Sequence, residues 1–169
     1  GNDRAGLMLV WCRIIDSFVY EWNDFHPVDR WIAEIERQLA EAPGFPSLEI
    51  AAQIACGMFM ALMYRQPQNP KISLWAERVQ AAVLRHPDAR VRMVLGNQLL
   101  LYHTAWIGDL GQARLLLDAV HPPENLADTS PLAFIAWCAM EAGYHWFMAE
   151  HDDCLRAVNR GLEAAKRSG

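Results

Sequence analysis

A pattern of apolar and aromatic residues recurs four times along the chain at roughly 40-residue intervals, a period typical of stacked helical repeats. The reference points are one position in the second helix of each predicted pair: Trp31, Trp75, Ala113 and Ala157. Eleven residues before each reference point stands an aromatic residue: Tyr20, Tyr64, Tyr102 and Trp146. One helical hairpin cannot bury its apolar face alone, so hairpins in such a register are expected to stack and share a core.

Between breaks rich in proline and glycine, apolar residues recur at helical spacing, and no alternating strand pattern is seen. This predicts an all-α fold of eight helices, over residues 3–25, 27–42, 47–66, 70–85, 88–107, 109–120, 130–150 and 152–167. They form four antiparallel pairs in one domain over residues 1–169, with the pairs at about 3–42, 47–86, 88–121 and 130–168. Ser47, Asp88 and Asp109 are expected to cap helices by accepting a hydrogen bond from a backbone N–H that has no partner in the helix.

The segment GDLGQA at residues 108–113, with Leu117 four residues further on, is similar to the start of the second helix in tetratricopeptide repeats. There a Gly-Asp turn precedes a small residue that packs against the first helix. A second match surrounds Ala157, whereas Trp31 and Trp75 stand at the small-residue position of the first two pairs. The chain resembles the long, degenerate tetratricopeptide-like arrays in sensor regions of large bacterial transcription regulators and signal-transduction ATPases.

This resemblance implies a right-handed α-solenoid. Together with the lack of catalytic motifs, the repeat register leads us to expect a chain that is not an enzyme and uses no cofactor. The resemblance also implies an effector-sensing or protein-interaction segment of a larger bacterial regulatory protein. Its partner would be a protein, a peptide or a neighbouring domain of the same chain. This chain starts within predicted helical residues, lacks an initial methionine and ends directly after a predicted helix. We therefore expect it to be a fragment of a longer polypeptide.

In such arrays the first helices of the pairs line a concave face, and here that face is expected to carry aromatic, methionine and a few polar side chains. The candidate binding residues are Arg13, Asp16, Tyr20, Met60, Tyr64, Gln98, Tyr102 and Trp146. Side chains of these kinds suit a peptide or a small apolar ligand. In the alternative interpretation the four aromatic residues only pack between adjacent pairs, with their polar tips reaching water or a backbone carbonyl.

The composition argues against two classes of partner. The net charge is −5 and is spread along the chain, whereas direct nucleic-acid binding needs a basic patch. The longest apolar run, from Ile54 to Tyr64, is shorter than the roughly 20 residues of a membrane span. The cysteines form no CxxC pair, and a thiol packs like a small apolar group. We therefore expect Cys12, Cys56 and Cys138 to be packing residues in a cytoplasmic protein.

No catalytic, cofactor-binding or metal-binding set is predicted. His145 and His151 are six residues apart, which does not place two ligands on one helix face. The glycines at positions 108 and 111 belong to a turn and not to a phosphate-binding loop. The serines have no histidine and aspartate partners at a recognisable spacing.

Two further hypotheses belong to other classes of function. The chain could be a structural spacer or dimerisation module, with a weak homodimer formed through apolar surface on the end helices. It could also be a helical enzyme domain with a buried polar pocket near Arg13, Asp16 and His103.

Overall fold

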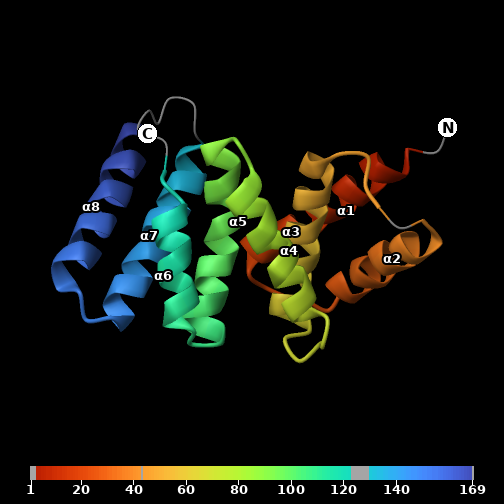
Figure 1. The fold of residues 1–169 in the computed structure, drawn as a ribbon, viewed down its shortest axis with the longest axis horizontal. Coiled ribbons are helices and arrows are strands. Elements are labelled where there is room, and N and C mark those ends of the chain that lie inside the picture. Colours follow the sequence, from red (N-terminus) through yellow and green to blue (C-terminus); the bar gives the residue numbers. More distant parts are fainter. Residues whose placement is uncertain (1–2, 43, 123–129, 169) are drawn as a thin grey trace. The chain divides into compact units, whose positions relative to one another are not determined.

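The computed structural model describes residues 3–42, 44–122 and 130–168, and these residues form helices and turns without any strand (Figure 1). The helices are α1 (Arg4–Glu21), α2 (Val28–Glu41), α3 (Leu48–Arg65), α4 (Ile72–Arg85), α5 (Ala89–Leu101), the π-helix η1 (Tyr102–Trp106), α6 (Leu110–Ala119), α7 (Pro131–Phe147) and α8 (His151–Ser168). The prediction of an all-α chain with eight α-helices is confirmed for the described residues.

The three expected helix caps are present. The side chain of Ser47 accepts a hydrogen bond from the backbone N–H of Ile50 at 3.2 Å. Asp88 and Asp109 cap α5 and α6 in the same way, at 2.8 and 3.0 Å. These bonds satisfy backbone donors that the first turn of a helix leaves without an internal partner.

Three helices end differently from the prediction, and one of them is the seventh, which ends at Phe147 and not at Glu150. The first ends at Glu21 and not near Phe25, because Trp22 adopts a left-handed conformation (φ 47°) and its N–H closes the last turn on the carbonyl of Phe18. The fifth was expected to run to Ile107 as one α-helix. It changes into the π-helix η1 at Tyr102, where the N–H of Ile107 donates to the carbonyl of Tyr102 at 3.1 Å.

The chain divides into two compact units, residues 1–82 and 83–169, and the boundary falls within α4. In the first unit α1 packs against α2 and α3, and α2 also contacts α3. The α1–α3 contact is closest at Gly57, where an added methyl group would lie 2.6 Å from the sulfur of Cys12. A residue without a side chain is therefore needed for α1 and α3 to approach as they do.

In the second unit α5 packs against α6, α7 and η1, and α7 also contacts α6, η1 and α8. The core of this unit surrounds Trp137, which is only 1% exposed. Its ring lies close to the backbone of α5, because a methyl group added to Gly96 would be 3.3 Å from the Trp137 Cζ3 atom. Gly161 of α8 makes a similar approach to Cys138.

Several positions of the predicted repeat register are buried. Twenty residues before the reference points, all four side chains are buried: Trp11, Ala55, Met93 and Trp137. Of the reference positions themselves, Trp75, Ala113 and Ala157 are buried and Trp31 is half-buried. These particular positions are therefore core or partly buried positions in the two units.

Among the described residues, α3 is the one helix whose length and hydropathy would suit a membrane span. More than half of that stretch, 56%, is buried within the protein. Met58, Phe59 and Leu62 are fully buried. The composition of α3 is thus accounted for by its place in the core.

A polar pocket in the second unit as the candidate functional site

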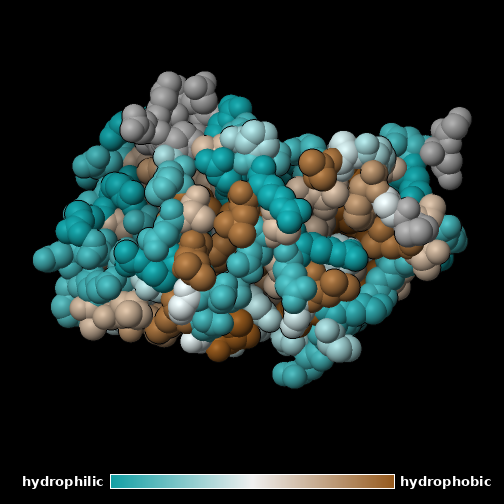
Figure 2. Space-filling model, in the orientation of Figure 1, coloured by the Kyte–Doolittle hydropathy of each residue, from teal (hydrophilic) through white to brown (hydrophobic). Residues whose placement is uncertain are grey.

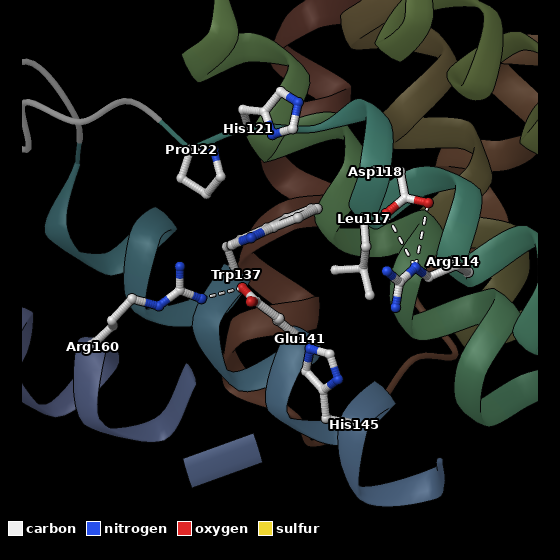
Figure 3. A pocket seen from close by; sticks show the side chains of 9 residues that line it. All are labelled: Arg114, Leu117, Asp118, His121, Pro122, Trp137, Glu141, His145 and Arg160. Atoms are coloured by element: carbon white, nitrogen blue, oxygen red, sulfur yellow. Dashed lines mark hydrogen bonds and ion pairs between the residues drawn. The ribbon is translucent and has the colours of Figure 1, made fainter. Parts of the chain in front are cut away.

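A pocket of about 240 Å³ lies between α6, α7 and α8 in the second unit (Figure 3). Polar and charged side chains dominate its walls, and apolar groups form the remainder. The lining residues are Arg114, Leu117, Asp118, His121, Pro122, Trp137, Glu141, His145 and Arg160. Its volume is below the roughly 300–1,000 Å³ of sites for drug-sized ligands, so it suits a small molecule or a single side chain.

Helical spacing places these side chains on common faces. Trp137, Glu141 and His145 follow one another at intervals of four along α7 and therefore share one face of that helix. Arg114 and Asp118 have the same spacing on α6, and Arg160 reaches the pocket from α8. Figure 3 shows Trp137 and Glu141 between the two arginine side chains.

The charges of the pocket are arranged in pairs of opposite sign. Arg114 bonds to Asp118 at 3.1 Å, and the guanidinium of Arg160 bonds to the carboxylate of Glu141. The carboxylate of Asp118 raises the pKa of Arg114, so this guanidinium stays charged. Glu141 is the most buried of the four, with 18% of its side chain exposed. Two cations and two anions thus face a small space above a buried indole.

The residues predicted to form one binding face have very different environments. Tyr20 and Trp146 are 73% and 72% exposed, whereas Met60 and Tyr102 are buried in the core. Tyr64 and Gln98 are half-buried. Met60 and Tyr102 therefore offer almost no surface to a ligand in the described structure.

In the first unit, Tyr64 belongs to a cluster of aromatic rings. The Phe25 ring stacks on it with centroids 5.5 Å apart, and the Trp22 ring meets it edge-on at 5.3 Å. Burial, and then the neighbouring Tyr20, raise the pKa of Tyr64 to about 12. The Phe25 ring also meets the Trp22 ring edge-on, with centroids 6.1 Å apart, so the three rings form one aromatic cluster.

Arg13 and Asp16 form an ion pair of 3.2 Å on α1, in which Arg13 is exposed and Asp16 is half-buried. Burial raises the pKa of Asp16. Burial, and then the charge of Asp16, also raise the pKa of Cys12 and of Cys56 to about 12. Both thiols therefore stay protonated at neutral pH and pack as small apolar groups.

Trp146 lies at an apolar edge of the second unit. Exposed large side chains gather at the ends of η1 and α7: Trp106, Ile107, Trp146, Phe147 and Met148. In Figure 2 apolar side chains are visible at the lower edge of this unit, below these helix ends. Exposed apolar groups in such number are typical of a contact surface.

His103 lies within η1 and belongs to the second unit, whereas Arg13 and Asp16 belong to the first unit. It is 7% exposed, and neither ring nitrogen has a hydrogen-bond partner among the described residues. The hydroxyl of the adjacent Thr104 is also buried, and no described residue forms a hydrogen bond with it. Burial lowers the pKa of His103, and the charge of Asp109 opposes this effect. π-Helical turns occur often at functional sites, but here Tyr102, His103 and Thr104 are buried, and no residue of η1 lines the pocket.

The buried His103 predicts a specific loss of stability in acid. Its pKa in the folded state is below the ordinary 6.5. As the pH falls below 6.5, the unfolded chain therefore takes up the proton first and unfolding becomes easier. The measurement is denaturant unfolding between pH 5 and 8. As the pH falls, the free energy of unfolding is expected to decrease less for His103→Leu than for the original protein, and the difference is at most about 1.4 kcal/mol per pH unit. An equal decrease in the free energy of unfolding for both proteins would show that His103 is not protected from protonation.

None of the pocket's charged residues was predicted as a site residue. The spacing of Glu141 and His145 and that of Arg114 and Asp118 are visible in the sequence, and both indicate shared helix faces. The contact of Arg160 with Glu141 joins α7 to α8 and has no signal in the sequence. Comparison with protein-family models, curated proteins and solved structures finds no match to this chain.

Proposed function

We propose that this chain is a non-catalytic effector-sensing or interaction module of a larger cytoplasmic regulatory protein in bacteria. Its helices would form antiparallel pairs in a right-handed tetratricopeptide-like solenoid. Two observations support that arrangement: alternate helices contact one another in each unit, α1 with α3 and α5 with α7, and register positions are buried in both units. Neither nucleic acid nor membrane is part of the proposal.

The observation that carries the proposal is the balance of charge in the pocket of the second unit. A simple anion would have to displace Asp118 or Glu141 from the arginines. A small zwitterion can give its carboxylate to an arginine and its ammonium group to a carboxylate, so that every charge keeps a partner. The volume of about 240 Å³ fits a molecule of amino-acid size. We therefore assign the pocket to a free α-amino acid acting as effector.

The test is a screen of the standard free α-amino acids by isothermal titration calorimetry. We expect saturable one-to-one binding of at least one of them. Arg160→Gln is expected to weaken that binding at least about tenfold, because a hydrogen bond to a charged group contributes roughly 1.5–3 kcal/mol. The control is Arg167→Gln, since Arg167 is also on α8 and pairs with Glu163 but lies outside the pocket.

Two results would contradict this assignment. One is that no amino acid binds at millimolar concentration. The other is that Arg160→Gln and Arg167→Gln bind the same amino acid equally well. In the second case the ligand would occupy another part of the protein.

A stripe of apolar side chains on α8 favours dimerisation as a second candidate function. The stripe follows the spacing i, i+3, i+7, which places its side chains on one face of the helix. It consists of Leu155, Val158 and Leu162, which are 60%, 40% and 53% exposed. Exposed apolar residues in such a row commonly mark an interface. A molar mass by light scattering that stays monomeric at high concentration would exclude this homodimer.

A further inference from the structure

The turn between α7 and α8 brings together three side chains of the kinds that bind metal ions. His145 lies in the last turn of α7, Glu150 lies in the connection, and Asp153 lies in the first turn of α8. Ala149 between them is left-handed (φ 57°), and the N–H of Glu150 donates to the carbonyl of His145 at 2.9 Å. This backbone turn folds the Glu150 carboxylate back onto the imidazole.

The ligand atoms are close together. The His145 Nδ1 atom is 2.6 Å from a carboxylate oxygen of Glu150. One ligand atom from each of the three residues lies within 4.8 Å of the other two. Two ligands on a tetrahedral Zn²⁺ ion are about 3.3–3.5 Å apart, given bonds of about 2.0–2.2 Å. The widest separation therefore needs to close by at most about 1.5 Å, which a rotation of the 43%-exposed Asp153 side chain can supply.

The local charges also favour a dication. Two carboxylates and a neutral imidazole carry a net charge of −2. The N-terminus of α8 contributes only about half a positive charge, and the C-terminus of α7 contributes a similar negative one. Arg156 pairs with Asp153, but both groups are substantially exposed, and such surface pairs contribute little. The carboxylates thus dominate the field at this turn.

We propose that His145, Glu150 and Asp153 form a binding site for a divalent zinc ion. Imidazole and carboxylate are both common zinc ligands, and three protein ligands leave the fourth position open to water. Ligation by both residues replaces the hydrogen bond between the His145 Nδ1 atom and the Glu150 carboxylate. Because His145 also lines the pocket, zinc binding fixes the orientation of one pocket wall. The site itself does not depend on the amino-acid proposal.

The test uses the full chain, stripped of metal with a chelator and then titrated with Zn²⁺ against a chromophoric competitor. One ion per chain is expected, and Co²⁺ in the same site is expected to give visible absorption bands. Asp153→Asn and Glu150→Gln are each expected to weaken binding at least about tenfold. Asp152→Asn is the control, because Asp152 is the adjacent acidic residue in the same helical turn but lies outside the cluster. Arg156→Gln is expected to tighten binding, since it removes the cation that pairs with Asp153.

The zinc site would be overturned if Asp152→Asn and Asp153→Asn lost equal affinity for Zn²⁺. It would also be overturned if Co²⁺ bound to the protein without giving visible absorption bands. Circular dichroism of each variant establishes that it is folded before titration. Failure of the zinc site leaves amino-acid binding and its dependence on Arg160 unaffected. Failure of the amino-acid proposal likewise leaves the zinc stoichiometry unchanged, so the two outcomes can be told apart.

Discussion

Replacing Trp137 with alanine is expected to lower the free energy of unfolding by about 3–5 kcal/mol, the usual cost of removing a buried aromatic side chain. Trp137 is the largest fully buried side chain and rests against the backbone of α5 at Gly96. Its removal leaves a cavity that rigid helices cannot fill completely. Denaturant unfolding followed by far-ultraviolet circular dichroism measures the loss.

The matched control is Trp146→Ala. Trp146 lies on the same helix, two and a half turns further on, but it is 72% exposed. Its replacement is expected to cost less than about 1 kcal/mol, because most of its surface is already in water. Equal losses in the two variants would contradict the central position of Trp137 in the second unit.

Replacing Gly57 with alanine is expected to destabilise the first unit by about 2 kcal/mol. Alanine gains up to about 1 kcal/mol over glycine as a helix former. Here that gain is outweighed, because the added methyl group would lie 2.6 Å from the Cys12 sulfur and 2.8 Å from its Cβ atom. The sulfur can rotate away, but the Cβ atom is fixed to α1, so the two helices must separate. Overpacking of this kind typically costs 1–3 kcal/mol, occasionally more.

Gly143→Ala provides the control for this substitution. Gly143 is also inside a long helix, α7, but a methyl group added there meets no atom within 4 Å other than those of its chain neighbours and its own helix backbone. This variant is expected to raise the free energy of unfolding by roughly 0.5–1 kcal/mol. Thermal or denaturant unfolding in which Gly57→Ala behaves like Gly143→Ala would show that α1 and α3 are not in the close contact described.

Local signals in the sequence predict most of the helices. Apolar spacing and the caps at Ser47, Asp88 and Asp109 depend on neighbouring residues only, and each of these features is found in the structure. The early end of α1 is different, because the left-handed conformation of Trp22 is unusual for a large side chain and has no sequence signature. The π-helical turn at Tyr102 is likewise invisible to a pattern based on α-helical spacing.

The aromatic row illustrates why the candidate site was harder to predict. Tyr20 and Tyr102 stand at equivalent register positions, yet one is 73% exposed and the other is buried. Exposure depends on which helices cover a position, and a shared register does not specify that. The pocket has the same origin, because Arg160 and Glu141 meet only through the packing of α8 on α7. The sequence shows which side chains are charged, but it does not show that Arg160 and Glu141 meet at one pocket.

The most direct test of the proposed function follows the indole N–H signals of the seven tryptophans by nuclear magnetic resonance during titration with a free amino acid that binds. Trp137 forms the buried base of the pocket, whereas Trp22 belongs to the aromatic cluster of the first unit. A saturable shift of the Trp137 signal, with Trp22 unchanged, is the expected result. A shift at Trp22 with none at Trp137 would contradict the assignment of the pocket as the effector site.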